Sequence, residues 1–307
     1  MHLTDKRVLV TGGAGFIGSN LANHLATEND VIVVDDGYLG TPDNLDDAVE
    51  LHEKSVLDND LPTDVDAVFH LAALSSYKMH EENPTKGARV NIEGFVNTVE
   101  QARNDGCDTV VYASTSSIYG NRTEPSPVDM DVTVNTGYEA SKLAREKYAE
   151  YFANHYDMNM AGMRFFSVYQ GYGGAEGHKK EYANVIAQFA DDMAKGEAPV
   201  LFGDGTQTRD FTHVDDIVQG LVLAAENQLT GVYNLGTGEQ ISFNELVELL
   251  NEELDTDIEP EYIENPIPDS VYVHDTMADY SQIHAETGWE PKIALREGLE
   301  SVCEQYH

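Results

Sequence analysis

The chain of 307 residues is poor in cysteine and in basic residues, and each shortage excludes a class of protein. Cys107 and Cys303 are the only cysteines, which excludes a disulfide framework or a zinc cluster and fits a reducing compartment. Only 18 Lys and Arg stand against 55 Asp and Glu, and the formal net charge of −37 would be repelled by nucleic acid and by anionic membranes. No apolar run reaches about 18 residues, and the opening MHLTDKRVLV enters a strand-like segment without space for a signal peptide. We therefore expect a globular, cytoplasmic protein.

Acidic residues are spread along the whole chain rather than gathered in a tail. Asp and Glu interrupt ordinary helical patterns, as in NELVELLNEELDTD at 244–257, so they belong to a folded surface. At low salt such a surface repels itself, whereas concentrated salt screens the repulsion over a few ångströms. The charge predicts a protein adapted to high salt, from a halophilic host. The alternative is an ordinary acidic cytosolic protein.

Short Val-rich segments alternate with helical patterns through the first half of the chain. The strand-like segments, each bounded by Gly, Asp or Ser, are 7–11, 31–35, 67–72 and 109–114. The helical patterns between them include 15–28, 84–105 and 137–156. Continuous apolar character marks strands buried on both faces, and the alternation predicts a doubly wound parallel sheet in an α/β fold. After about residue 165, Gly-rich and Pro-punctuated loops predict a smaller, partly irregular lobe.

A glycine motif follows the first predicted strand and leads into a helix. Gly12 permits a tight turn, Gly15 lets a pyrophosphate approach the main chain, and Gly18 allows close packing of helix on strand. The helix N-terminus then offers unpaired N–H groups to the phosphates. Asp35 ends the second strand 17 residues after Gly18, where a carboxylate binds the adenosine ribose and, with Asp36, repels a 2′-phosphate. This context predicts an NAD site; the alternative is a glycine turn with an incidental Asp.

Tyr138 and Lys142 stand four residues apart near the start of the helical pattern 137–156, so their side chains share one face. A neighbouring ammonium stabilises a phenolate and lowers the pKa of the phenol from about 10 towards neutral. Tyr138 is therefore a candidate general acid and base, with Lys142 also able to bond the nicotinamide ribose. Such a pair by itself is common on an ordinary helix surface. Here a buried strand, YASTSSIYG at 112–120, ends in a series of hydroxyls.

Eight segments spread over the chain form an ordered set of motifs: VLVTGGAGFIGSNL, HLAALSS, VNIEGFVNTVEQAR, YASTSSIYG, YEASKLAREKY, LFGDGTQTRDFTHVDDIVQG, YNLGTGE and TGWEPKIALREGL. Together they resemble the extended short-chain dehydrogenase/reductase family, in particular nucleotide-sugar epimerases of the UDP-glucose 4-epimerase type. We accordingly expect a Rossmann-type NAD-binding domain in residues 1–165, with a returning segment near 210–236. Residues 166–209 and 237–307 are expected to form a smaller C-terminal substrate-binding lobe.

By this resemblance, the catalytic groups are Thr115, four positions before Tyr119, together with Tyr138 as acid and base and Lys142. The residues expected around the cofactor are Gly12, Gly15, Phe16, Ile17, Gly18, Asp35, Asp36, Ser55, Val56, Leu71, Ala72, Ala73, Asn91, Ser114, Tyr138, Lys142 and Phe165. Those expected around the nucleotide-sugar substrate are Thr115, Ser167, Lys179, Arg209 and Asp269, and no metal ligands are expected. The chain departs from the family pattern at three positions: Ser55 for Asp, Ser167 for Asn and Ile267 for Arg.

The residues after Thr115 separate the sibling reactions of the family. Dehydratases carry acidic residues directly after the catalytic hydroxyl, and sugar-acid decarboxylases carry a Glu two positions after it, whereas this chain has Ser116 and Ser117. The resemblance therefore implies an epimerase, which oxidises a sugar hydroxyl transiently with NAD and reduces the keto-sugar on its other face. Three alternatives stay open: an NAD-dependent sugar dehydrogenase with net turnover, another nucleotide-sugar epimerase or dehydratase, and a non-catalytic NAD-binding structural or sensing module.

Two further expectations come from the same resemblance. Lys179, in the segment EGHKK at 176–180, is an ordinary exposed loop residue, a cation that attracts an anionic substrate, or a second catalytic Lys as in heptose 6-epimerases. A homodimer is expected through apolar stripes on helices near 86–105 and 137–156. The alternative is that these stripes simply pack on the sheet.

Overall fold

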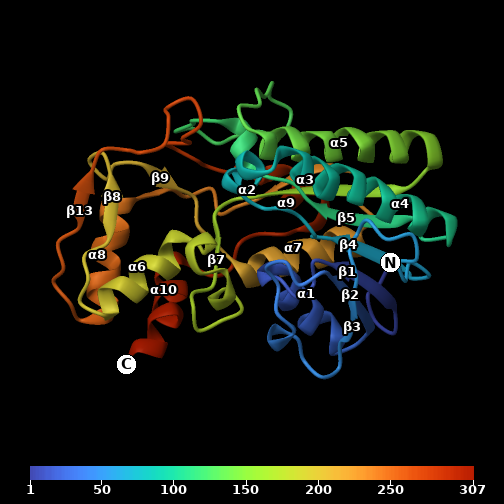
Figure 1. Cartoon of the computed structure of the whole chain (residues 1–307), viewed down its shortest axis with the longest axis horizontal. Coiled ribbons are helices and arrows are strands. Elements are labelled where there is room, and N and C mark those ends of the chain that lie inside the picture. Colours follow the sequence, from blue (N-terminus) through green and yellow to red (C-terminus); the bar gives the residue numbers. More distant parts are fainter.

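A central sheet of seven strands organises the protein, whose computed structural model describes residues 1–307 (Figure 1). Its strands lie in the order β11-β6-β5-β4-β1-β2-β3, and every neighbouring pair is parallel. Their bounds are β1 (Arg7–Thr11), β2 (Asp30–Asp35), β3 (Glu50–Glu53), β4 (Ala67–His70), β5 (Thr109–Ala113), β6 (Asn159–Phe165) and β11 (Gly231–Leu235). The four strands expected from the sequence are confirmed as β1, β2, β4 and β5, and the Rossmann-type α/β fold is confirmed with them.

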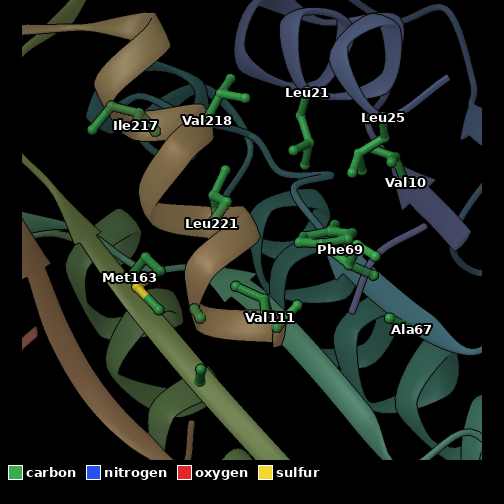
Figure 2. Packing of buried hydrophobic residues seen from close by; sticks show 14 of the residues in the cluster. Val10, Leu21, Leu25, Ala67, Phe69, Val111, Met163, Ile217, Val218 and Leu221 are labelled. Carbon is green, nitrogen blue, oxygen red and sulfur yellow. The ribbon is translucent and has the colours of Figure 1, made fainter. Parts of the chain in front are cut away.

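Helices cover both faces of this sheet, because the buried strands present apolar side chains to both sides. α1 (Phe16–Ala26) and α7 (Val214–Glu226) pack on one face, and α4 (Gly94–Asn104) and α5 (Gly137–Tyr156) pack on the other (Figure 1). Figure 2 shows the first of these cores, in which α1 and α7 meet the strands through Val10, Leu21, Leu25, Ala67, Phe69, Val111, Met163, Ile217, Val218 and Leu221. The second core includes Leu9, Val68, Phe95, Val99, Tyr112 and Phe152.

One expected helix is interrupted in the structure. The pattern 84–105 divides into α3 (Pro84–Ala88), a π-helical turn (Arg89–Glu93) and α4, and α2 (Tyr77–Glu82) precedes them. Within the turn, the buried Asn91 amide bonds both main-chain groups of Leu74, at 2.8 and 3.1 Å. A π-helical turn contains one residue more than an α-helical turn, and the normal apolar spacing continues before and after it. Helical periodicity in the sequence therefore does not reveal it.

The chain after β6 builds a second packed region beside the sheet. Its strands pair two by two: β7 (Val168–Tyr169) with β10 (Thr212–His213), β8 (Val200–Phe202) with β13 (Glu261–Ile263), and β9 (Thr208–Arg209) with β12 (Ile241–Ser242). Its main helices, α6 (Val185–Ala194), α8 (Phe243–Leu254) and α10 (Leu295–Cys303), share an apolar core of their own. Both α7 and β11 return to the large sheet, where α9 (Ser281–Thr287) packs beside β11. None of the helices combines the length and the apolar character needed to cross a bilayer.

Candidate active site

A single cavity of about 690 Å³ lies at the carboxyl edge of the sheet, where the second packed region meets it. Most of the residues predicted for the cofactor and the substrate line it together. They are Gly12, Gly15, Phe16, Ile17, Gly18, Asp35, Asp36, Val56, Leu71, Ala72, Ala73, Ser114, Thr115, Tyr138, Lys142, Phe165, Ser167, Lys179 and Arg209. Because one continuous cavity joins the glycine motif to the hydroxyls after β5, a dinucleotide and a second ligand can meet there.

The glycine turn before α1 is too crowded for side chains and leaves the helix N-terminus open. A Cβ on Gly12, whose φ is +69°, would lie 2.6 Å from the main-chain N of Ala72. On Gly18 it would lie 2.1 Å from the carbonyl oxygen of Gly12. No side chain caps α1 and its first turn holds no acidic residue, so its N–H groups face the cavity with a favourable dipole. These features fit the pyrophosphate of a dinucleotide.

Asp35 and Asp36 follow at the end of β2, on the same side of the cavity. The Asp35 carboxylate accepts hydrogen bonds from the N–H groups of Ala14 at 3.1 Å and Gly37 at 2.9 Å. Burial raises the pKa of Asp35, and the two main-chain donors oppose that rise. Asp36 is exposed and accepts from the N–H of Tyr38 at 3.1 Å. Two carboxylates at this position fit ribose hydroxyls and disfavour the 2′-phosphate of NADP.

Three predicted site residues lie outside the cavity lining. Ser55 turns its hydroxyl into its own turn, where it accepts from the N–H of Leu57 at 3.3 Å, and Val56 lines the cavity instead. Asn91 is wholly buried and fastens the Leu74 main chain rather than facing the cavity. Asp269 is exposed on a loop whose Ile267 reaches the cavity. Hydrogen bonds within the protein hold the side chains of Ser55 and Asn91, whereas that of Asp269 faces solvent.

The three predicted catalytic side chains meet at the ends of β5 and α5. Thr115 follows β5, and its hydroxyl lies 2.8 Å from that of Ser117. Tyr138 is the second residue of α5 and Lys142 follows one turn later, with its Nζ 5.7 Å from the centroid of the Tyr138 ring. The Lys142 ammonium donates to the carbonyl oxygen of Ala113 at 3.1 Å. The main chain at the end of β5 therefore holds Lys142 beside Tyr138 and Thr115.

A capping box fixes the start of α5 and with it the position of Tyr138. The Thr136 hydroxyl accepts from the N–H of Glu139 at 3.2 Å, and the Glu139 carboxylate accepts from the N–H of Thr136 at 3.1 Å. Such reciprocal bonds satisfy helix N–H groups that would otherwise lack partners. The helix begins at Gly137, as the sequence predicts, so Tyr138 stands on its first turn.

The electrostatics of the pair differ from the prediction that Lys142 lowers the pKa of Tyr138. Burial raises the pKa of the phenol, and hydrogen bonding with Thr115 and the positive charge of Arg145 oppose that rise. Burial, reinforced by Arg145, holds the pKa of Lys142 well below its ordinary value. The cation that favours the phenolate in this structure is therefore Arg145, which the sequence interpretation did not assign.

Two buried charged residues that follow Lys142 on α5 were missed from the sequence. Arg145 is fully buried, and Glu146 forms a buried ion pair with Arg164 at 2.7 Å. The Glu146 carboxylate also accepts a hydrogen bond of 2.5 Å from the hydroxyl of Ser114, next to Thr115. The sequence could have indicated their burial, because they follow Lys142 by three and four residues and so lie on the same helix face. In so acidic a chain, charged residues in a helix indicate a solvated face instead.

Basic residues are concentrated in the cavity. Six of the 18 Lys and Arg line it, against four of the 55 Asp and Glu. The six are Lys54, Lys78, Lys86, Lys142, Lys179 and Arg209. Lys180, which the sequence interpretation paired with Lys179, is not among the lining residues. The lining is thus net positive within a strongly negative protein, which favours an anionic ligand.

The two cations predicted for the substrate are both held by protein groups. The Lys179 ammonium lies 3.9 Å from the buried Glu176 carboxylate, and burial lowers its pKa. The Arg209 guanidinium donates to the carbonyl oxygens of Thr208 and His274, each at 2.7 Å, and burial lowers its pKa as well. Both groups are thereby oriented at the cavity wall before any ligand arrives.

Together, the fold and the cavity define a dinucleotide-binding enzyme whose cavity contains a Tyr–Lys pair, Tyr138 and Lys142. A family model described as the NAD dependent epimerase/dehydratase family matches residues 8–236. The chain belongs to this family, and its cofactor is NAD, which the open α1 N-terminus and the Asp35 carboxylate fit.

Curated relatives align over nearly the full length. The UDP-glucose 4-epimerase of Mycolicibacterium smegmatis is 33% identical over 312 residues, covering 97% of each chain. UDP-glucuronic acid decarboxylase 6 of Arabidopsis thaliana is 30% identical over 315 residues, covering 99% of this chain and 89% of the relative. The family resemblance expected from the motifs is confirmed.

Solved structures of epimerases superpose closely on this protein. UDP-N-acetylglucosamine 4-epimerase from Methanobrevibacter ruminantium, in complex with UDP-N-acetylmuramic acid, has a TM-score of 0.91 at 28% identity, covering 99% and 98% of the two chains. UDP-glucose 4-epimerase with UDP-glucose from Thermotoga maritima has a TM-score of 0.88 at 33% identity, covering 98% of each. UDP-glucose 4-epimerase from Thermus thermophilus, in complex with NAD, has a TM-score of 0.86 at 29% identity, again covering 98% of each.

The crowding at Gly18 leads to a prediction about NAD binding. We expect Gly18→Ala to weaken NAD binding at least about tenfold, because a Cβ 2.1 Å from the Gly12 carbonyl forces the turn away from the helix N-terminus. The dissociation constant is measured by isothermal titration of NAD into protein from which bound nucleotide has been removed. The control is Gly137→Ala, whose Cβ meets only ordinary contacts beginning at 3.5 Å. Equal affinity in the Gly18→Ala variant would show that the phosphates do not approach this turn.

Proposed function

We propose that this protein interconverts nucleotide sugars that differ in configuration at C4, with UDP-hexoses as the substrates. The protein is an NAD-dependent sugar epimerase of the extended short-chain dehydrogenase/reductase type. One observation carries the proposed reaction: Thr115, Tyr138 and Lys142 line the cavity that also contains the open N-terminus of α1. A sugar hydroxyl placed against Tyr138 would then lie within reach of a bound dinucleotide.

NAD, when bound, supplies reversible acceptance of a hydride from the sugar carbon. Tyr138 then removes the hydroxyl proton as the keto-sugar forms, and Thr115 donates a hydrogen bond to the reacting oxygen. After the keto-sugar presents its other face, Tyr138 returns the proton to the oxygen. Lys142, held by the Ala113 carbonyl, lies beside the phenol with its ammonium 5.7 Å from the ring centroid. The cycle leaves the cofactor as it began and changes one stereocentre.

The position two residues after Thr115 favours epimerisation over decarboxylation, although decarboxylases are among the relatives. Ser117 occupies it, and its hydroxyl is engaged with that of Thr115 at 2.8 Å. A hydroxyl has no pKa suited to moving protons near neutral pH, whereas a carboxylate does. Ser116 is buried and offers no carboxylate for an elimination either. We therefore assign a reaction that needs one acid and base, Tyr138.

Positive charge in the cavity supports a diphosphate-bearing substrate. We assign Lys179 and Arg209 to substrate binding, with Ser167 lining the same wall. Lys179 is not an exposed loop residue, because its side chain is only 21% accessible and contacts Glu176. Burial lowers the pKa of the Lys179 ammonium, which suits it either to bind an anion or to exchange a proton. We assign it to anion binding, because that role needs no second proton-transferring group.

We also propose a division of the chain between the two ligands. Residues 1–165 with 210–236 would hold NAD, and residues 166–209 with 237–307 would hold the sugar.

Replacing Tyr138 by Phe tests the assigned mechanism. We expect Tyr138→Phe to lower epimerase turnover by about 10²- to 10⁴-fold, since the proton acceptor is lost, while NAD binding is unchanged. Conversion of UDP-glucose to its C4 epimer, followed by NMR in concentrated salt, measures turnover. The matched control is Tyr77→Phe, a cavity Tyr on α2 away from β5. Full activity in Tyr138→Phe would refute the mechanism, and stoichiometric NADH from the wild type would favour a dehydrogenase instead.

We also propose that the protein is a homodimer joined through α5. Three tyrosines of this helix, Tyr148, Tyr151 and Tyr156, are 42%, 46% and 36% exposed, an unusual group of aromatic side chains on such an acidic surface. We expect Tyr151→Glu to shift the sedimentation of the protein towards the monomer. Tyr262→Glu, at a Tyr that is 50% exposed on β13, is the control and leaves the assembly unchanged. A wild-type monomer at micromolar concentration would contradict the proposal.

We further propose a salt-adapted protein of the cytoplasm. Only Glu139, Glu146, Glu176, Asp210 and Asp216 are buried among the 55 acidic residues, so nearly all of the negative charge is near solvent. Raising KCl from about 0.1 M to about 2 M shortens the range of their repulsion several-fold. We expect the unfolding temperature to rise over this interval, as measured by calorimetry. A flat or falling unfolding temperature would favour an ordinary acidic protein.

A further inference from the structure

Arg145 is a fully buried guanidinium without a carboxylate partner. It donates to three main-chain carbonyl oxygens: to Asn91 at 2.6 Å, to Ala72 at 2.7 Å and to Ala113 at 3.4 Å. No ion pair of the protein includes it, so its positive charge is stabilised by main-chain dipoles and by the Phe95 ring, whose centroid lies 5.9 Å from the guanidinium carbon. A buried charge without an opposite charge nearby lowers the stability of the folded protein. Residues that carry such a charge are kept mainly where function requires them.

The three carbonyls belong to three segments around the cavity. Ala72 follows β4 and Ala113 ends β5, and both residues line the cavity. Asn91 lies in the π-helical turn that interrupts the helix before α4, and its carbonyl receives the shortest of the three bonds. Such turns often occur at functional sites. Arg145 therefore ties the walls of the cavity to α5.

Arg145 shares an acceptor with the catalytic Lys. The Lys142 ammonium donates to the Ala113 carbonyl at 3.1 Å, and the Arg145 guanidinium reaches the same oxygen at 3.4 Å. The two residues stand three apart on α5, so both project from one face of the helix. Removing the guanidinium would take away one of the two side-chain donors to this carbonyl and loosen the main chain that holds Lys142 beside Tyr138.

The charged and titratable groups around Arg145 leave its charge uncompensated. From α5 they are Tyr138, Glu139, Lys142 and Glu146, from β4 His70, from β5 Tyr112 and from α2 His80. Glu146 is engaged by Arg164 and by the Ser114 hydroxyl. Glu139 is engaged by the main chain that caps α5. Burial lowers the pKa of both histidines, so they are neutral at pH 7.

We propose that Arg145 is a positioning residue for proton transfer, which fixes Lys142 against Tyr138 and keeps an uncompensated positive charge beside both. This role rests on the proposed function of Tyr138 as acid and base. Burial lowers the pKa of Arg145 to about 10, so the guanidinium is still protonated at neutral pH. Its charge acts to lower the pKa of Tyr138 and that of Lys142.

The direction of the electrostatic effect does not depend on which partner loses its proton first. The Lys142 Nζ lies 5.7 Å from the centroid of the Tyr138 ring, and the charge of Arg145 acts in the same direction on both groups. A neighbouring positive charge favours the loss of either proton, so Arg145 lowers both apparent pKa values. Neutralising position 145 therefore raises both values and makes the base form of the pair available only at higher pH.

The test compares three variants of the NAD-loaded protein: Arg145→Met, Arg145→Lys and, as control, Lys147→Met. Lys147 is an exposed cation of the same helix, paired with Glu150 at 3.1 Å. The phenol of Tyr138 is titrated by phenolate absorbance, taking the difference between each protein and the same protein carrying Tyr138→Phe. The pH dependence of kcat/KM for UDP-glucose is measured alongside. We expect Arg145→Met to raise the apparent pKa in both experiments by about 1, Arg145→Lys to restore most of the shift, and Lys147→Met to change neither.

A purely structural Arg145 would give a different result. Arg145→Met would then lower the thermal unfolding temperature or the rate at every pH, with the phenol titration unchanged, and that outcome would overturn the proposal. If Arg145→Met does not fold, Arg145→Gln takes its place, because it also removes the charge but retains an amide donor. The phenol titration needs no sugar substrate. A shift there in a protein that epimerises nothing would therefore refute the proposed function and support only the electrostatic effect of Arg145 on Tyr138.

Discussion

The site depends on the contact between one charged face of α5 and the end of strand β5. Lys142, Arg145 and Glu146 are nearly or fully buried on α5, and buried charges must find polar partners. They find them at the carbonyl of Ala113 and the hydroxyl of Ser114, where β5 ends. Because these bonds fix α5 against the strand ends, Tyr138 and the hydroxyls after β5 are brought to one wall of the cavity.

A second constraint is the contrast between the exterior and the cavity. The exterior carries most of a net charge of −37, whereas the cavity lining holds more basic than acidic residues. A doubly negative diphosphate is repelled by the surface at long range and attracted near the opening. Concentrated salt strongly weakens the repulsion by the exposed surface. It weakens the attraction near the cavity less, because partly buried charges are screened less. The same composition thus suits both a salty solvent and an anionic substrate.

Much of this arrangement was predictable from the sequence, and the part that was not has a physical reason. The bounds of α5 and of β1, the cradle around Gly12 and Gly18, and the Tyr138–Lys142 pair follow from local periodicity and turn chemistry. The π-helical turn and the burial of Arg145 and Glu146 do not, because both depend on contacts between segments far apart in the chain. Asn91 illustrates the limit: the family resemblance assigns it to the cofactor site, but the sequence does not show that its amide bonds the Leu74 main chain.

In the proposed mechanism, a hydride leaves one sugar carbon and returns to the same carbon within one cavity, while Tyr138 moves only the hydroxyl proton. Its most direct test is to incubate the NAD-loaded protein with UDP-glucose in D₂O and to follow C4 by NMR. We expect conversion to the C4 epimer with no deuterium at C4, because the hydrogen on carbon never exchanges with solvent. Deuterium incorporated at C4 during conversion would contradict it, since that would require a proton to be removed from carbon.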